Sequence, residues 1–183
     1  GLMQLKNADI YVTGSNSKFL SSDISTEFRG RGDEIRVNPL SFAEFYEAFK
    51  GDKYDAWDDY ITYGGMPRIL SLRSDEEKTK YLSDLFKMTY VKDIVERHNL
   101  RGNVVIESLI DVLASSVGSL SNPTKIASTF TSNGVNASDK TISSYIEYLE
   151  DSFLIRKAQR YDIKGRKYIN SPFKYYFSDV GLR

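Results

Sequence analysis

A short apolar run, Asp9 to Thr13, leads directly into the polar turn Gly14-Ser15-Asn16-Ser17. If the run is a buried strand, the turn places small polar groups at the carboxyl edge of a sheet, where open α/β sheets bind ligands. The same residues also suit a plain strand-to-helix turn, because Gly, Ser and Asn are each favoured in turns. The stretch therefore predicts either a ligand-binding turn or an ordinary one.

Two further stretches have residue types that could contact a phosphate or a nucleotide. Arg29-Gly30-Arg31-Gly32 sets two arginines beside glycines, and a guanidinium can fork onto two phosphate oxygens. Tyr63-Gly64-Gly65-Met66-Pro67 lets the backbone approach another group closely. Both stretches also read as solvent-exposed turns, so the residues alone leave the two interpretations open.

The sequence does not favour other common kinds of catalytic site. It contains no cysteine, which excludes a thiolate nucleophile, a disulfide framework and a zinc finger. The single histidine, His98, has no metal-ligand spacing around it, so a surface or helix-cap role is expected and no metal site is predicted. Asp58-Asp59 reads as a solvated helix face, and Asp75-Glu76-Glu77 as an exposed helix start where the dipole favours acids.

Composition indicates an ordinary globular protein. Of the 183 residues, 27% are charged and 40% hydrophobic, which fits one domain or two small ones with a real core. The net charge of zero argues against a nucleic-acid-binding surface over the whole molecule. No apolar run approaches the roughly 20 residues of a membrane span, and no signal peptide is visible, so we expect a cytoplasmic protein without membrane contact.

The elements expected in the first half are mostly helices. Asp33 to Asn38 reads as a strand, and Ser41 with Glu44 forms a capping box for a helix over Phe42 to Phe49. Periodic apolar residues predict further helices over Asp52 to Tyr63 and Asp75 to His98. Asn99 to Asn103, polar and with a glycine, is the best domain boundary.

The second half has the element order of a winged helix-turn-helix. A helix is expected over Val104 to Val117, with Val105, Leu109, Val112 and Leu113 facing inward. Asn122 and Pro123 start a second helix, which Ser132-Asn133-Gly134 ends, and Ser138 caps a third. The segments Leu154 to Tyr161 and Lys174 to Ser178 then read as a two-stranded hairpin.

The hairpin region carries a strong local charge. Residues 154–176 include seven basic side chains and one acidic one, a local net charge of +6. Double-stranded DNA is a plausible partner for such a wing. The candidate contacts are Lys164, Arg166 and Lys167 on the hairpin and Lys140, Ser143 and Ser144 on the preceding helix.

Acidic residues in the second half of that helix argue the other way. Glu147, Glu150 and Asp151 would repel phosphates, and they could instead pair with basic residues of the hairpin. The alternative is therefore a regulatory or protein-interaction module without nucleotide chemistry.

Several motifs together resemble one prokaryotic protein family. In chain order they are Val12-Thr13-Gly14-Ser15-Asn16-Ser17, Arg29-Gly30-Arg31, Pro39-Leu40-Ser41-Phe42-Ala43-Glu44-Phe45, Tyr63-Gly64-Gly65-Met66-Pro67, Tyr90-Val91-Lys92-Asp93-Ile94 and Tyr176-Phe177-Ser178-Asp179-Val180-Gly181-Leu182. Their order and spacing resemble the AAA+-superfamily ATPases of archaea and bacteria that carry a C-terminal domain of unknown function. The resemblance covers essentially the whole chain.

This resemblance implies roles for individual residues. Ser15 and Asn16 match the sensor position, which reaches the γ-phosphate or its attacking water. Arg31, with Arg29 as second choice, matches an arginine that stabilises transition-state charge on a phosphate. Gly64, Gly65 and Pro67 match a lid motif that packs on the adenine.

The chain departs from the family pattern at both ends. Neither the phosphate-binding loop nor the acidic metal-holding strand is in this sequence, nor is the nuclease-like domain that usually follows Asp-x-Gly-Leu. We therefore expect a fragment that does not hydrolyse ATP itself, with ATP and Mg²⁺ bound only by a full-length parent. Without their sheet, Asp9 to Thr13 and Glu34 to Asn38 are expected to be rearranged, disordered or paired with another copy.

The prediction is thus a mainly α protein of the α+β kind in two parts. Residues 1–98 are expected to be the last part of an ATPase core with its helical lid, and residues 99–183 a winged helix-turn-helix domain. The expected partners are double-stranded DNA and, through unpaired strands, a second copy of the chain.

Overall fold

The computed structural model describes residues 35–159 apart from Arg101 and Asn103, residues 172–183, and the single positions Asn7, Asp9, Tyr11 and Thr13. The chain divides into two units, residues 1–34 and residues 35–183, and we call the second unit the body. Most expectations for Asp9 to Thr13, the Ser15 and Arg31 turns and the hairpin tip therefore lie outside the described residues.

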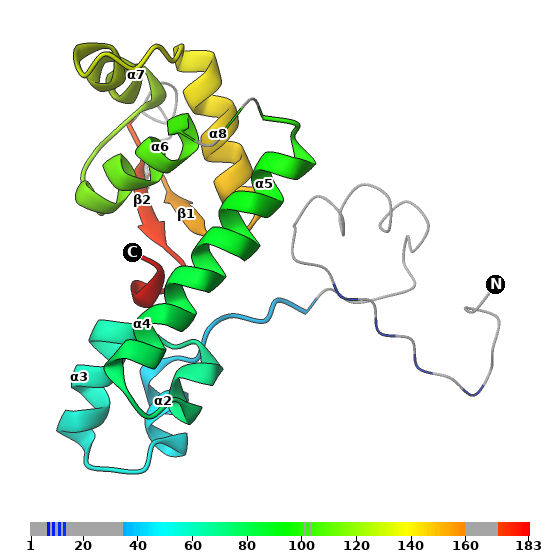
Figure 1. Cartoon of the computed structure of the whole chain (residues 1–183), viewed down its shortest axis with the longest axis vertical. Coiled ribbons are helices and arrows are strands. Elements are labelled where there is room, and N and C mark those ends of the chain that lie inside the picture. The colour runs from blue at the N-terminus through cyan, green and yellow to red at the C-terminus, as the bar shows by residue number, and fades with distance from the viewer. Residues whose placement is uncertain are drawn as a thin grey trace, which may run out of the picture. The chain divides into compact units, whose positions relative to one another are not determined.

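The body is mainly helical with one small sheet, as expected (Figure 1). Its elements in chain order are α2 (Phe42–Ala48), α3 (Lys53–Tyr63), η3 (Pro67–Ser71), α4 (Asp75–Asp84), η4 (Leu85–Val91), α5 (Lys92–Arg97), α6 (Val104–Ser115), α7 (Pro123–Ser132), α8 (Asp139–Asp151), β1 (Ile155–Ala158), β2 (Lys174–Phe177) and η5 (Val180–Leu182). No helix in the described part of the chain is both long and apolar enough to cross a membrane.

Helix starts follow the expected caps closely. Ser41 and Glu44 form the reciprocal capping box of α2, and the Asp52 carboxylate caps α3. The Asn122 side chain accepts the N–H of Lys125 at 2.8 Å with Pro123 in the first turn of α7, and Ser138 caps α8. The expected caps Ser41, Asn122 and Ser138 are confirmed, because each needs only donors within three residues of the chain. The Asp52 cap was not predicted.

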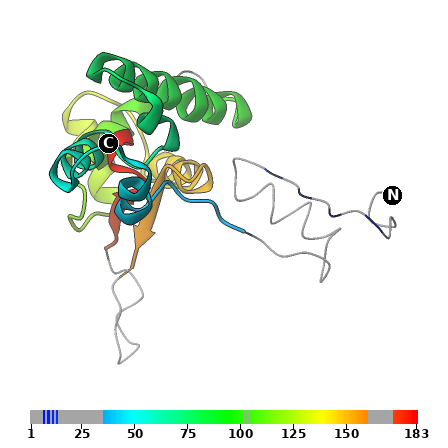
Figure 2. The same ribbon diagram turned by 90° about the horizontal axis from the view of Figure 1, so that it is seen from below.

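One long helical rod connects the two halves of the body (Figures 1 and 2). The helix expected over Asp75 to His98 is present, but its middle, η4, is wound as a π-helix, which the periodicity did not predict. Ser74 and Glu77 form a capping box at one end, and His98 is the C-terminal cap at the other. The rod therefore reaches from the α2–α3 pair to α8.

The hairpin closes the second half of the body. β1 and β2 pair antiparallel, with Ile155 opposite Phe177 and Ala158 opposite Lys174, and a single bridge joins Ser121 to Phe173. Helix α8 packs on α7 and β1, and α6 packs on α8 and β2. The helix-helix-helix-hairpin order expected from the sequence is therefore present.

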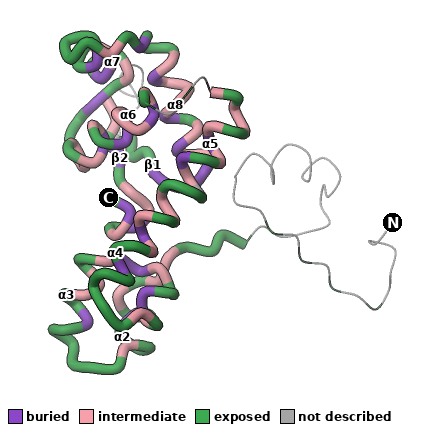
Figure 3. Tube along the Cα trace, viewed as in Figure 1, coloured by how far each residue is buried: buried purple, intermediate pink, exposed green. Residues whose placement is uncertain are grey.

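The core runs through the whole body (Figure 3). Among its fully buried side chains are Phe45, Ile69, Ile94, Ile106, Leu109, Leu113, Ile142, Leu149, Leu154 and Ile155. On α6 the expected Leu109 and Leu113 are buried, whereas Val105 and Val112 are only half-buried and Ile106 and Ile110 take the inner positions. The inward face is thus rotated slightly from the expected one.

One predicted strand is wrong, and the predicted domain boundary stays a prediction. The strand expected over Asp33 to Asn38 is wrong for residues 35–38, which belong to no strand. The boundary between residues 98 and 99 stays a prediction, since residues 35–183 cluster as one unit.

Candidate functional site

Three of the sequence motifs converge on one buried carboxylate. The side chain of Asp179 is only 6% exposed, and its two oxygens accept the backbone N–H groups of Gly65 at 2.7 Å and Gly181 at 2.9 Å. The backbone of Gly65 also accepts the N–H of Leu40 at 2.8 Å. We call Leu40, Gly64, Gly65, Asp179 and Gly181 the glycine–aspartate junction.

Each glycine of the junction is required by a close approach. Gly64 has φ +78°, and a Cβ there would collide with the Asp179 carboxylate. A Cβ on Gly65 would meet the carbonyl oxygen of Leu40, and one on Gly181 would meet the carbonyl oxygen of Tyr63. The glycines therefore let three chain segments touch through their backbones.

Two tyrosines border the junction. The Tyr60 hydroxyl donates to the carbonyl oxygen of Leu40 at 3.0 Å. Burial and then the charge of Asp179 raise the pKa of both Tyr60 and Tyr90. The Asp179 charge thus faces α3 and η4 as well as the glycine turn.

The backbone contacts and the burial of the glycine turn limit how the predicted adenine-binding motif could hold a nucleotide. The N–H of Gly64 donates to the carbonyl oxygen of Tyr60, and that of Gly65 to Asp179, while Pro67 has none. Both glycines are buried, whereas Pro67 is exposed and Met66 half-buried. The N–H groups of Gly64 and Gly65 are therefore engaged within the chain, and Met66 and Pro67 offer packing surface to a nucleotide at this turn. The adenine role stays a prediction.

An acidic pocket of about 570 Å³ lies between α3 and α4. Asp55, Asp58, Asp59 and Asp75 line it together with Lys78, and Phe49, Ile69, Leu70 and Leu72 supply apolar walls. The charge of Asp52 is the main cause that raises the pKa of Asp55, with smaller contributions from Asp58 and Asp59. With four carboxylates and one ammonium group, this pocket repels phosphates.

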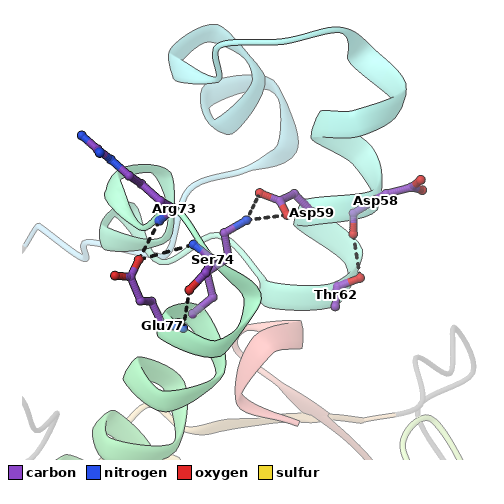
Figure 4. Close-up of polar contacts among 7 residues, drawn as sticks. Asp58, Asp59, Thr62, Arg73, Ser74 and Glu77 are labelled. Carbon is purple, nitrogen blue, oxygen red and sulfur yellow. Dashed lines mark hydrogen bonds and ion pairs between the residues drawn. The ribbon is translucent and has the colours of Figure 1, made fainter.

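The pocket's single cation is already neutralised within the chain. The Lys78 ammonium bonds both carboxylate oxygens of Asp59 at 2.6 Å and lies 4.9 Å from the centre of the Tyr63 ring. Figure 4 shows Asp59 on α3 turned toward α4, whose first turn carries Ser74 and Glu77. The Lys78–Asp59 pair therefore fastens α4 to α3, a role that the sequence pattern did not reveal.

The predicted nucleic-acid contacts are only partly described. Lys140 is exposed at the start of α8, and Ser143 and Ser144 are half-buried. In the C-terminal half of α8, Tyr148 is covered by the His98 ring, which stacks on it with centroids 3.5 Å apart. Lys164, Arg166 and Lys167 lie outside the described residues.

Two described cations of the hairpin, Arg156 and Lys157, have partners within the chain. Arg156 donates to the side-chain oxygen of Asn38. Lys157 lies 3.8 Å from the centre of the Phe173 ring, and its charge and backbone lower the pKa of Glu150, which burial raises more strongly. The charge of Lys157 therefore acts on Glu150, whereas the pairing of α8 acids with hairpin bases stays a prediction.

Two glycines with the same backbone conformation allow a direct test of the junction. Gly64 (φ +78°) and Gly134 (φ +76°) differ in that a Cβ would collide with Asp179 at the first and meet nothing within 4 Å at the second. We expect Gly134→Ala to lower the free energy of unfolding by about 1 kcal/mol and Gly64→Ala by clearly more, measured by urea denaturation. Equal losses would show that the close approach of Asp179 is not required.

Asp179 should also leave a pH signature. Burial raises its pKa despite the two N–H donors, so the folded state holds this proton more tightly than the unfolded chain. The corresponding stability is complete below the unfolded pKa of about 4 and is lost as pH rises through the higher folded pKa. The stability advantage of the native chain over Asp179→Asn should therefore shrink from about pH 4 toward neutral pH. An advantage that grows over this range would mean that the hydrogen bonds outweigh burial.

Comparisons with known proteins divide the chain in two. A model described as an AAA domain matches residues 2–46, which indicates a relationship to AAA-type ATPases. The model of a domain of unknown function, DUF8612, matches residues 54–183. No solved structure matches the chain significantly.

Two curated relatives are longer than this chain. An uncharacterized protein of Haemophilus influenzae is 39% identical over 97% of this chain and 45% of its own length. An uncharacterized protein of Methanocaldococcus jannaschii is 29% identical over 86% of this chain and 38% of its own length. The chain thus spans less than half of these relatives. Because the matching model covers most of its residues, the chain belongs to the family described as a domain of unknown function, DUF8612.

Proposed function

We propose that this chain is part of an AAA-type ATPase, in which residues 35–98 connect the nucleotide-binding core to a winged helix-turn-helix over residues 99–183. The observation that carries the proposal is where the AAA match ends. It ends at residue 46, inside α2, and α2 begins two residues after Leu40 of the glycine–aspartate junction. Within the body, Leu40 is thus linked to Asp179 through the backbone of Gly65, so a displacement of α2 is passed to Asp179 through hydrogen bonds.

ATP and Mg²⁺ would need residues beyond those described. The N–H groups of Gly64 and Gly65 are engaged within the chain, and the acidic pocket repels phosphates. No group of three or more His, Cys, Asp or Glu within the described ranges is placed to hold a metal ion. When bound, ATP would supply the phosphoryl chemistry, and Ser15, Asn16 and Arg31 would position or stabilise its phosphates.

We expect the full-length protein to release phosphate from ATP in the presence of Mg²⁺ and the 183-residue chain not to do so. Arg31→Ala in the full-length protein should lower turnover by about 10³-fold or more while ATP still binds, since an arginine of this kind acts mainly in the transition state. Arg73→Ala, on an exposed residue before α4, is the matched control and should leave turnover unchanged. Unchanged turnover in Arg31→Ala, or turnover by the 183-residue chain, would contradict the assignment.

A second function, binding of double-stranded DNA, is favoured by the hairpin. Its order after α6, α7 and α8, and the Ser121–Phe173 bridge, fit a winged helix-turn-helix, and residues 154–176 carry a net charge of +6. Lys140 at the exposed start of α8 would add a phosphate contact. Partial covering of α8 by His98 favours phosphate contacts over reading of the base sequence.

Fluorescence anisotropy of a labelled duplex at two salt concentrations tests this function. We expect salt-sensitive binding, with the double variant Arg166→Ala/Lys167→Ala weakening it and reducing the log–log salt slope by about 2. The double variant Lys80→Ala/Lys87→Ala removes the same charge from exposed positions on the rod and should bind like the native chain. If no binding occurs at low salt, the protein-interaction alternative replaces this one.

A further inference from the structure

The α2–α3 pair exposes a cluster of large apolar side chains. Tyr54, Trp57 and Ile61 of α3 are 83%, 46% and 50% exposed, and Tyr46 of α2 is 39% exposed. The Phe42 ring joins the two helices, because it lies 4.8 Å from the Trp57 ring and 6.1 Å from the Tyr46 ring, centre to centre. We call Tyr46, Tyr54, Trp57 and Ile61 the aromatic face.

This face points away from the core of the body. The inward side of α3 is formed by Ala56, which is fully buried, and by the half-buried Tyr60 and Tyr63. Tyr54 and Ile61 lie two helical turns apart, on the side of α3 opposite to Ala56, Tyr60 and Tyr63. They therefore face away from the core when Ala56 faces it. Adjacent exposed aromatic side chains on one surface are typical of an interface that another protein surface covers.

The family matches indicate what covers it. The AAA match ends at Tyr46 and the DUF8612 match begins at Tyr54, so the two matched segments meet at the aromatic face. The AAA match spans only residues 2–46, and a segment of this size is too short to bury a core of its own. The relatives are more than twice as long as the part that this chain covers. A full-length relative therefore has enough further chain to complete an AAA domain, and the matched part of that domain joins the body at α2.

We propose that the aromatic face is the surface on which the remainder of the AAA domain docks in the full-length protein. This inference rests on the proposed function and adds to it the interface between the nucleotide-binding core and the helical body. The polar neighbours of the face carry both signs of charge, with Asp55 and Asp58 beside Lys50 and Lys53, all exposed. The docking surface is accordingly apolar at its centre with a charged rim.

Cysteine labelling can test the proposal because the chain has no native cysteine. The variant Tyr54→Cys replaces a highly exposed side chain and should react quickly with a maleimide in the 183-residue chain. In the full-length protein, we expect the labelling rate at this position to fall at least about tenfold, read by peptide mass spectrometry. The control Val104→Cys, at a 65% exposed position on α6, should react at the same rate in both proteins.

Different outcomes would overturn the docking surface and the proposed function. Equal Tyr54→Cys rates in the two proteins overturn the docking surface. Protection that rises with the concentration of the 183-residue chain itself means that a second copy covers the face, which also overturns it. ATP binding by the full-length protein is measured in parallel on the protein without the added cysteine. Retained ATP binding with equal labelling rates refutes the interface alone, whereas failure to bind ATP refutes the proposed function.

Discussion

The constraint on which the body depends is the burial of one carboxylate. Asp179 is removed from water, and its two hydrogen bonds reach backbone N–H groups that lie 114 and two positions away in the sequence. An uncompensated charge in this place would be costly, so the glycine turn and the C-terminal segment have to stay together. The backbone of Leu40 joins the same point, and three distant segments are thereby held as one unit.

The rod of α4, η4 and α5 extends this unit to the hairpin end. Lys78 holds its first part to Asp59 of α3, and His98 at its far end stacks on Tyr148 of α8. Its middle is π-helical, a less regular winding that is often found at functional sites. A body connected in this way is suited to carrying a change of position from the α2–α3 pair to α8 and the hairpin.

Several of the described polar groups form hydrogen bonds, ion pairs or ring contacts with other groups of the chain. The glycine N–H groups, Lys78 and the hairpin cations Arg156 and Lys157 all have partners inside the chain. Such groups stabilise and position the fold, and the residues to which the proposed function gives phosphate roles belong to the AAA-matched segment.

The sequence by itself determined the local features. Ser41 with Glu44, Asn122 with Pro123, and Ser138 predict helix starts correctly, because a cap needs only donors a few residues away. Tertiary structure alone decided which distant groups meet. Asp179 with Gly65, Lys78 with Asp59, and His98 with Tyr148 are pairs that no spacing rule connects. The strand expected over Asp33 to Asn38 has no partner at residues 35–38, since a strand forms only where another backbone satisfies its hydrogen bonds. Periodicity specifies which face of an element is apolar, but packing chooses what that face meets.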